Sequence, residues 1–241
     1  MTLRARLSAI DERIADAARR AGRDPGEITR IVVTKFHPAS LVRELHELGV
    51  RDVGENRQQE MSAKRAALRQ AQGPEHAQEP EQGQPLRWHF IGQAQTNKAA
   101  AIRRDADVVH SVDRVKLADA LHRAAETDQG RDPLDVLVQV NLSEDAGRGG
   151  STVADAQALA EHVLSLPTLR LRGVMAVAPL DEQPAAAFAR LAGVAERIRA
   201  LDPAATWISA GMTGDFEEAI DAGATHLRIG SAITGPRPDR G

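Results

Sequence analysis

The chain has 241 residues and a formal net charge of −3, from 31 lysines and arginines against 34 aspartates and glutamates. This balance gives no reason to expect nucleic acid or an anionic membrane as a partner. The chain contains no cysteine, which excludes disulfides and cysteine-based metal sites, and no tyrosine, which excludes a tyrosine acid or base from within the chain. No apolar run approaches the ~20 residues that cross a bilayer, and the N-terminal residues lack a signal core, so we expect a cytoplasmic protein.

Apolar residues at helical spacing predict a leading helix over residues 3–18, with Gly22 as a cap that ends it. After it, short apolar runs alternate with helical patterns along the whole chain. The predicted strands are 30–35, 50–54, 86–92, 108–111, 134–141, 169–177, 206–209 and 226–229. The predicted helices between and after them are 40–48, 56–69, 95–104, 114–126, 151–165, 184–201 and 215–222.

Strict alternation of strand and helix is typical of a (β/α)8 barrel or a doubly wound sheet. A dinucleotide-binding sheet carries a glycine fingerprint in its first strand–helix turn, whereas this turn reads Lys35-Phe36-His37-Pro38. We therefore predict an α/β fold, a single (β/α)8 TIM-like barrel over residues 1–241 with an extra N-terminal helix. Residues 70–85 are rich in Gln, Glu and Pro and are predicted to be a flexible surface insertion.

The first strand contains the run Ile31-Val32-Val33, which predicts a buried strand, and Lys35 lies at its carboxyl end. Lysine is rarely buried without a partner, so such a residue either turns out to solvent or faces a ligand. From this stretch alone, a solvated lysine is the more common outcome. A lysine in partly apolar surroundings has a lowered pKa, and its neutral amine can attack a carbonyl and form a Schiff base.

Polar or small residues follow several of the predicted strands, where a barrel of this class places its chemistry. Two loops contain glycine and a small hydroxyl residue just before a helical segment, Ser209 with Gly211, and Gly230 with Ser231. Free amides and the positive end of the helix dipole make such loops suitable for an anion, although the same residues also make ordinary caps. A phosphate site after strands 7 and 8 is common in this fold.

A lysine on strand 1 together with a phosphate site points to a phosphorylated aldehyde, and pyridoxal 5′-phosphate fits this description. Arg228 on the last strand is placed to face the ring nitrogen of this cofactor. An arginine keeps its proton in practice, so it would leave the pyridine nitrogen unprotonated and weaken the ring as an electron sink. This arrangement favours carriage of the cofactor over racemisation.

Several blocks of sequence resemble the pyridoxal phosphate homeostasis protein family, which is similar to the N-terminal barrel of alanine racemases, a fold-type III barrel. The blocks include Val-Val-Thr-Lys-Phe (32–36), Val-Gly-Glu-Asn (53–56), Trp-His-Phe-Ile-Gly-Gln (88–93), His-Ser-Val-Asp (110–113), Arg-Gly-Val-Met (172–175), Ser-Ala-Gly-Met-Thr-Gly-Asp (209–215) and Arg-Ile-Gly-Ser-Ala-Ile-Thr-Gly (228–235). They occur in order over nearly the whole chain. Family members bind the cofactor and affect vitamin B6 balance, and no catalytic turnover is generally accepted for them.

The resemblance implies a role for each matching residue. It makes Lys35 the lysine that forms a Schiff base with the cofactor, and Arg228 the residue that faces the ring nitrogen. The residues implied for the phosphate are Ser209, Gly211, Gly230 and Ser231, and those implied for the pocket lining are Asn56, His89 and Met175.

The chain departs from the family pattern at Arg148, where a lysine is usual, and at Ala176, where a hydroxyl residue often occurs. Two other functions stay open from the sequence. One is an amino-acid racemase-like enzyme that uses pyridoxal phosphate, and the other is a cofactor-free Schiff-base aldolase. The expected partners are pyridoxal phosphate and apo-enzymes that receive it, and the expected state of the chain is a monomer, because such a barrel covers its own strands.

Overall fold

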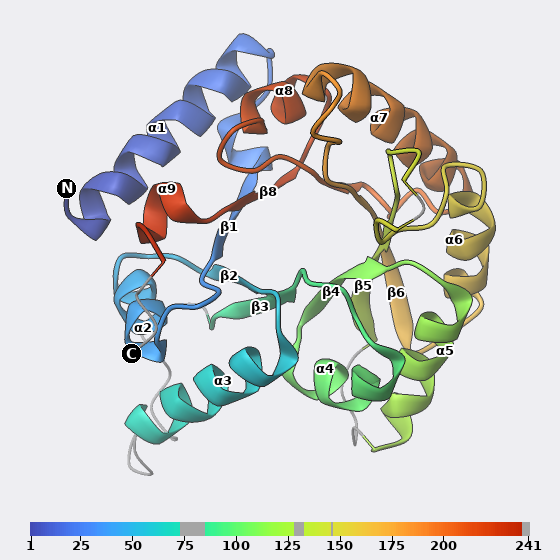
Figure 1. The fold of residues 1–241 in the computed structure, drawn as a ribbon, viewed down its shortest axis with the longest axis horizontal. Coiled ribbons are helices and arrows are strands. Elements are labelled where there is room, and N and C mark those ends of the chain that lie inside the picture. The colour runs from blue at the N-terminus through green and yellow to red at the C-terminus, as the bar shows by residue number, and fades with distance from the viewer. Residues whose placement is uncertain (73–84, 128–132, 146, 238–241) are drawn as a thin grey trace.

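The computed structural model describes residues 1–72, 85–127, 133–145 and 147–237, and it places eight parallel strands in a closed ring (Figure 1). Each strand pairs with its neighbour in sequence, and the last pairs with the first, with Thr29 opposite His226. The strands are β1 Thr29–Val33, β2 Asp52–Glu55, β3 Arg87–Phe90, β4 Val108–Val112, β5 Leu134–Gln139, β6 Leu169–Met175, β7 Trp207–Ser209 and β8 His226–Ile229. The predicted (β/α)8 barrel is confirmed.

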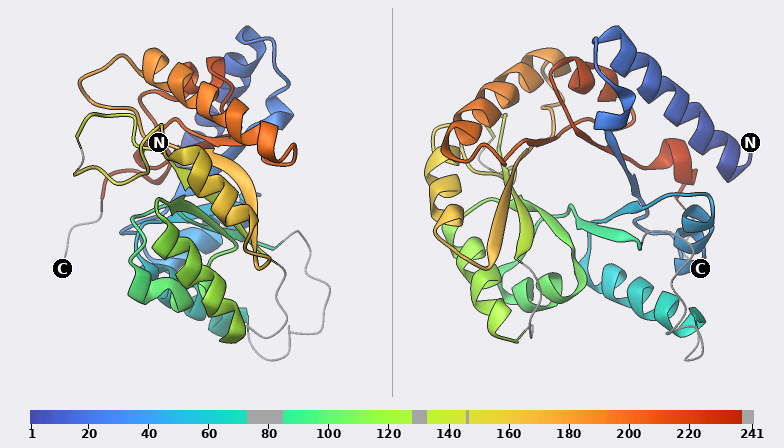
Figure 2. Two further views of the ribbon diagram at one scale, coloured as in Figure 1. Left: turned by 90° about the vertical axis from the view of Figure 1, so that its right-hand side faces the viewer. Right: turned by 180° about the vertical axis from the view of Figure 1, so that it is seen from behind.

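Helices surround the ring of strands and cover its outer face (Figures 1 and 2). They are α1 Leu3–Arg20, α2 Ala39–Glu47, α3 Gln58–Gln72, α4 Ala99–Asp105, α5 Val115–Arg123, α6 Ala156–Leu164, α7 Pro184–Leu201, α8 Phe216–Asp221 and α9 Ser231–Thr234. The core between helices and strands is apolar, with Val32, Val53, Val109 and Val136 fully buried on the outward face of the sheet. Among the described residues, none of these helices combines the length and apolar character needed to cross a membrane.

The extra N-terminal helix α1 lies against α8 and α9, next to the junction of the first and last strands (Figure 1). Its buried face consists of Leu3, Leu7, Ile10, Ile14, Ala17 and Ala18, the helical spacing predicted from sequence. Arg6 Nε donates to the carbonyl of Ile233 at 2.6 Å. The helix therefore fixes the end of the chain that follows β8.

Several predicted boundaries are wrong. β1 ends at Val33 instead of residue 35, because the chain turns at Thr34, and β6 ends at Met175 instead of residue 177. The predicted helix at 95–104 consists of a 3-10 turn at Thr96–Lys98 followed by α4. The predicted insertion at 70–85 lies mostly outside the described residues, and its first three residues form the end of α3.

The inside of the barrel is more polar than the branched apolar filling usual in this fold. Side chains alternate between the two faces of a strand, so every second residue points inward. The inward layer of Val108, Leu137 and Met175 is apolar. The other buried inward side chains include His89, His110, Ser209, His226 and Arg228. Buried polar groups generally need hydrogen-bond partners, and each of these side chains has at least one within the described residues, although Nε2 of His226 has none.

A bulge in β6 brings its backbone against β7. Val136 of β5 pairs with Leu171 of β6, and the next residue, Leu137, pairs with Gly173. Arg172 is therefore an extra residue in β6. Gly173 has a φ of +144°, and a Cβ added there would lie 1.9 Å from the carbonyl oxygen of Trp207. Only glycine allows this approach of the two strands.

We expect Gly173→Ala to lower the free energy of unfolding by about 3 kcal/mol or more, because the new methyl group overlaps the backbone of β7. Gly193→Ala is the matched control, since Gly193 lies exposed within α7 with open space around its Cβ position. That change should stabilise the protein by up to about 1 kcal/mol through helix propensity. Urea unfolding of both variants measures the difference, and equal stability would contradict the role given to Gly173.

Candidate functional site

Lys35 lies in a tight turn at the carboxyl end of β1, on the face where a barrel of this class carries its chemistry. The amide of His37 donates to the carbonyl of Thr34 at 3.1 Å, which closes the turn around Lys35 and Phe36. Phe36 has a φ of +70°, a left-handed conformation that a bulky residue adopts only under constraint. The Lys35 side chain is half-buried, and its Nζ lies 5.9 Å from the centre of the Phe36 ring.

Two side chains of α3 hold this turn in place. Glu60 Oε2 accepts the amide of Phe36 at 3.0 Å, and Lys64 Nζ donates to the carbonyl of Thr34 at 2.8 Å. The buried Lys64 also pairs with Glu55 at the end of β2. Burial raises the pKa of the Glu55 carboxyl, and the neighbouring Lys64 ammonium offsets part of this effect. The turn is therefore set by contacts from another element, which accounts for a left-handed residue that is not glycine.

Arg228 provides a buried cation on the opposite side of the β1–β8 junction. Its Nη1 donates to Ser209 Oγ at 2.7 Å, and its Nη2 donates to the carbonyl of Ala176 at 2.8 Å. Burial lowers the pKa of the Arg228 guanidinium to about 10, which still leaves it protonated at neutral pH. The contact with Ala176 uses the backbone, so the missing hydroxyl at this position does not affect it.

A row of hydrogen bonds runs from Ser209 through the barrel to its amino-terminal end. Ser209 Oγ lies 2.9 Å from His110 Nδ1, and His110 Nε2 lies 2.9 Å from His89 Nδ1. His89 Nε2 lies 2.8 Å from Oδ1 of Asp52, the first residue of β2. The same oxygen accepts from Arg87 Nε at 2.7 Å. This row of polar contacts therefore connects the carboxyl-terminal end of the barrel, at Ser209, with its amino-terminal end, at Asp52.

The pKa values of the buried groups follow from this packing. Burial lowers the pKa of both His89 and His110, the latter well below its ordinary value. Burial also lowers the pKa of His226 to about 3. For Asp52, burial alone would raise the pKa, but hydrogen bonds from His89 and Arg87 outweigh it and lower the pKa to about 2. The row therefore consists of neutral imidazoles ending on a carboxylate.

The other predicted site residues occupy different surroundings. Met175 lies inside the barrel with Val108 and Leu137, and it is opposite Ser209 in the register of β6 and β7. Asn56 directly follows β2, where its backbone carbonyl leaves no space for a side chain at Gly92. His89 is bonded on both ring nitrogens inside the barrel.

The two predicted phosphate loops also differ from each other. Gly211 has a φ of +89°, and a Cβ there would lie 2.8 Å from the Ala219 Cβ, so the backbone itself requires glycine. Gly230 lies beside the end of β1, with the Cβ of Val33 3.6 Å from its own Cβ position, and exposed Ser231 begins α9. The Gly230–Ser231 loop and the Lys35 turn are therefore neighbours.

Sequence reasoning missed several residues of this arrangement, namely Asp52, Glu60, Lys64 and His110. Part of the signal is in the sequence, because His110 and Ser111 interrupt a run of buried valines in β4. A polar residue on the inward face of a buried strand needs a partner, and this need identifies His110 as part of a network. Lys64 had no such signal, since α3 also contains Glu60, Arg65 and Arg69, and the sequence does not show which of these charged residues is buried.

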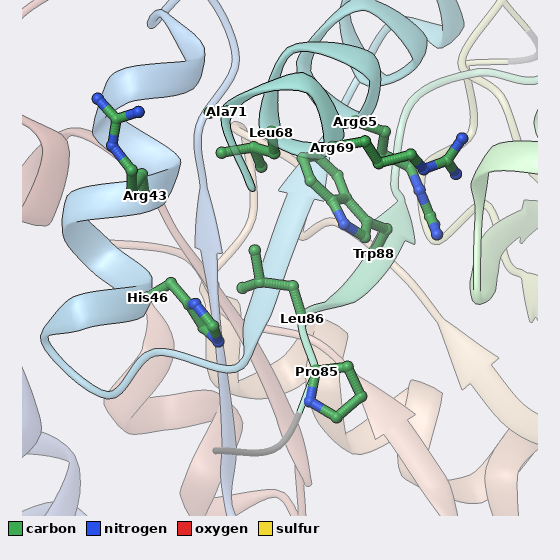
Figure 3. A pocket seen from close by; sticks show the side chains of 9 residues that line it. All are labelled: Arg43, His46, Arg65, Leu68, Arg69, Ala71, Pro85, Leu86 and Trp88. Carbon is green, nitrogen blue, oxygen red and sulfur yellow. The ribbon is translucent and has the colours of Figure 1, made fainter. Parts of the chain in front are cut away.

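Figure 3 shows a cleft on the outer flank of the barrel, between α2, α3 and β3. It is lined by Arg43, His46, Arg65, Leu68, Arg69, Ala71, Pro85, Leu86 and Trp88. Trp88 and His89 are adjacent in β3 and point to opposite faces of the sheet. The cleft on the Trp88 side is therefore separate from the site inside the barrel mouth.

Comparison with known proteins places the chain among pyridoxal-phosphate barrels. The model of the family "Alanine racemase, N-terminal domain" matches residues 5–238. The pyridoxal phosphate homeostasis protein of Pseudomonas aeruginosa is 41% identical over 98% of this chain and 96% of its own length. The one from Mycobacterium tuberculosis is 42% identical over 96% of this chain and 91% of its own length. PipY of Synechococcus elongatus, solved with PLP bound, has a TM-score of 0.79 and 32% identity over 97% of this chain and 100% of its own.

The left-handed conformation of Phe36 predicts an unusual order of stability for two variants. Phe36→Gly and Phe36→Ala both remove the ring, but only glycine adopts a positive φ without a steric penalty. We expect the glycine variant to be more stable by about 1 kcal/mol in urea unfolding. At a position with ordinary backbone angles alanine is at least as stable, so a more stable alanine variant would contradict this geometry.

The buried imidazoles predict a loss of stability at mildly acidic pH. Their ordinary pKa is about 6.5 in the unfolded chain and lower in the folded protein, so between these values the unfolded state binds more protons. The free energy of unfolding should fall as pH drops below about 6.5, by roughly 1.4 kcal/mol per pH unit for each of His89, His110 and His226.

Glu55 acts in the opposite sense, because its raised pKa keeps a proton in the folded state that the unfolded chain has released. Urea titrations at pH 7.5, 6.5, 5.5 and 5.0 measure the net slope. His226→Gln should reduce this slope by the contribution of one proton. A stability that stays constant from pH 7 to pH 5 is incompatible with neutral buried histidines.

Proposed function

The chain belongs to the pyridoxal phosphate homeostasis protein family, whose fold is the alanine racemase N-terminal barrel, and on this premise we propose how it holds its cofactor. The protein binds pyridoxal 5′-phosphate and takes part in cellular homeostasis of this cofactor, with Lys35 as the residue that forms a Schiff base to it. The observation that carries the assignment of the site is the buried Arg228 guanidinium at the end of the barrel that also bears the Lys35 turn. An amine, a fixed cation and an amide-rich loop on one barrel end suit a phosphorylated aldehyde with a ring nitrogen.

Lys35 supplies the amine in this proposal. The cofactor provides an aldehyde carbon, with which a primary amine condenses reversibly. Because α3 holds the backbone on both sides of Lys35, through Glu60 and Lys64, the side chain starts from a fixed point. Preorganisation of this kind lowers the entropy lost when a ligand binds.

Arg228 supplies the contact to the ring nitrogen. Two of the five N–H donors of its guanidinium are used by Ser209 and Ala176, which fix its plane and leave further donors for a ligand. A guanidinium that stays protonated donates to the ring nitrogen and does not protonate it. An unprotonated ring withdraws electrons weakly, so the site is suited to holding the cofactor more than to racemisation.

The phosphate group is assigned to the loops after β7 and β8. Ser231 and Ala232 begin α9, where the first amides of a helix have no acceptor within it. Gly230 lies within contact distance of Val33 at the end of β1, so a phosphate at this loop would lie near the Lys35 turn. In the β7 loop, Asp215 already accepts the amide of Met212 at 2.6 Å, so the loop after β8 is the stronger candidate.

We further propose an oligomeric state, a location and partners for the protein. It acts as a single barrel domain, a monomer in the cytoplasm that passes its cofactor to apo-enzymes. The helices around the barrel cover the outward faces of its own strands, which supports a monomer.

The visible spectrum of the purified protein tests this assignment. With pyridoxal 5′-phosphate added, the wild type should absorb as a Schiff base, and borohydride should fix the adduct on the peptide that contains Lys35, as read by mass spectrometry. Lys35→Ala should hold the cofactor only non-covalently. Lys98→Ala is the control, since Lys98 is also half-buried and follows β3, which is separated from β1 by β2, and it should behave as wild type. A covalent adduct in Lys35→Ala would place the Schiff base on another lysine.

A further inference from the structure

The row of hydrogen bonds inside the barrel ends on two groups that each have only one hydrogen-bonding role. At the mouth, the guanidinium of Arg228 can only donate. At the amino-terminal end, Asp52 is ionised and can only accept, and its low pKa supports this state. Between them lie Ser209, His110 and His89, each of which can donate or accept.

Burial lowers the pKa of both imidazoles, and for two neutral rings these ends determine the direction of every bond between them. His89 must donate from Nε2 to Asp52, so its Nδ1 is an acceptor. His110 must then donate from Nε2 to His89, which leaves the Nδ1 of His110 as the acceptor for the Ser209 hydroxyl. Ser209 in turn accepts from Arg228. Both neutral imidazoles therefore carry their proton on Nε2.

This direction decides what Ser209 can do. Its hydroxyl hydrogen is directed to His110, and its oxygen accepts from Arg228. The side chain therefore has no hydrogen left to donate to a phosphate. Its role is to present an electron-rich oxygen to the guanidinium, so the Ser209 hydroxyl does not donate to a phosphate.

We propose that Asp52, His89 and His110 are positioning residues that act through Ser209 to hold the Arg228 guanidinium against the ring nitrogen of the bound cofactor. The inference rests on the proposed function for the identity of the ligand, whereas the direction of the hydrogen bonds does not depend on it. Asp52 lies at the far end of the barrel from the site, where it lines a cleft with Arg30 and Arg51. A carboxylate at one end of the barrel thus stabilises the cation that faces the ligand at the other.

The barrel contains a matched control for Asp52. Asp135 is the second residue of β5, and its side chain is 13% exposed, as is that of Asp52. Each aspartate pairs with an arginine directly across on the next strand, Asp135 with Arg170 and Asp52 with Arg87. Only Asp52 also contacts a histidine of the row. A comparison of the two therefore separates the row from the general effect of losing an aspartate inside the barrel.

The first experiment measures the ring nitrogen shifts of His89 and His110 by ¹⁵N NMR in the protein without cofactor. We expect both imidazoles to be neutral and protonated on Nε2 at pH 7. A proton on Nδ1 of either ring, or a charged ring at pH 7, would overturn the assigned direction. This measurement uses the wild type and does not depend on any variant folding.

The second experiment measures the affinity for pyridoxal 5′-phosphate and the visible spectrum of the bound cofactor. Asp52→Ala should lower the affinity by about tenfold and shift the absorption band, because Arg228 loses the support of a charge-assisted row. Asp135→Ala should bind as wild type. Asp52→Asn keeps an oxygen that accepts from His89, so it should recover most of the affinity.

The outcomes distinguish the two proposals. If Asp52→Ala and Asp135→Ala bind alike, the positioning role is wrong even though the cofactor binds. If the wild type does not bind pyridoxal 5′-phosphate, the proposed function is wrong, and the NMR measurement still decides the direction of the row. If Asp52→Ala does not fold, His110→Phe replaces it, since it breaks the row at its centre and should give the same loss of affinity.

Discussion

A cation inside a closed barrel is the constraint on which the rest of this interior depends. A charged group transferred from water to a protein interior loses several kcal/mol of solvation unless it is paired and hydrogen-bonded. Arg228 receives a carbonyl from Ala176 and a hydroxyl from Ser209, and both acceptors are themselves held in the barrel wall. The Ser209 hydroxyl in turn needs an acceptor for its own hydrogen, which is His110. His110 and then His89 need an acceptor in the same way, and the last acceptor is Asp52. The row of polar side chains from Ser209 to Asp52 thus follows from the presence of Arg228.

The fold could be predicted from sequence because it depends on local periodicity, which every strand and helix carries in its own residues. The boundaries that failed depend on contacts from elsewhere in the chain. β1 ends at Val33 because Lys64 and Glu60 of α3 hold the following turn, and nothing in the run from Ile31 to His37 contains this information. A left-handed Phe36 is likewise unpredictable from a residue type that normally avoids this conformation.

In the candidate site too, some features can be predicted from the sequence and others depend on distant contacts. Lys35, Arg228 and the loops after β7 and β8 follow from strand order, since the carboxyl ends of parallel strands meet on one face. The partners of these residues do not follow from strand order alone. His110 and Ser209 are 99 positions apart and meet only because the barrel closes, and the contact depends on register and side-chain direction. The sequence predicts His89 as pocket lining, and the structure shows it inside the barrel with both ring nitrogens bonded, which register alone does not reveal.

Two lysines near this turn have different surroundings, because Lys64 is buried and Lys35 is half-buried. Lys64 donates to the carbonyl of Thr34 and pairs with Glu55, so its side chain is held by contacts within the protein. The same contacts hold the turn from which Lys35 projects. The fold thus uses Lys64 as a support for the backbone of the turn, and in the proposed site Lys35 is the amine left to meet the ligand.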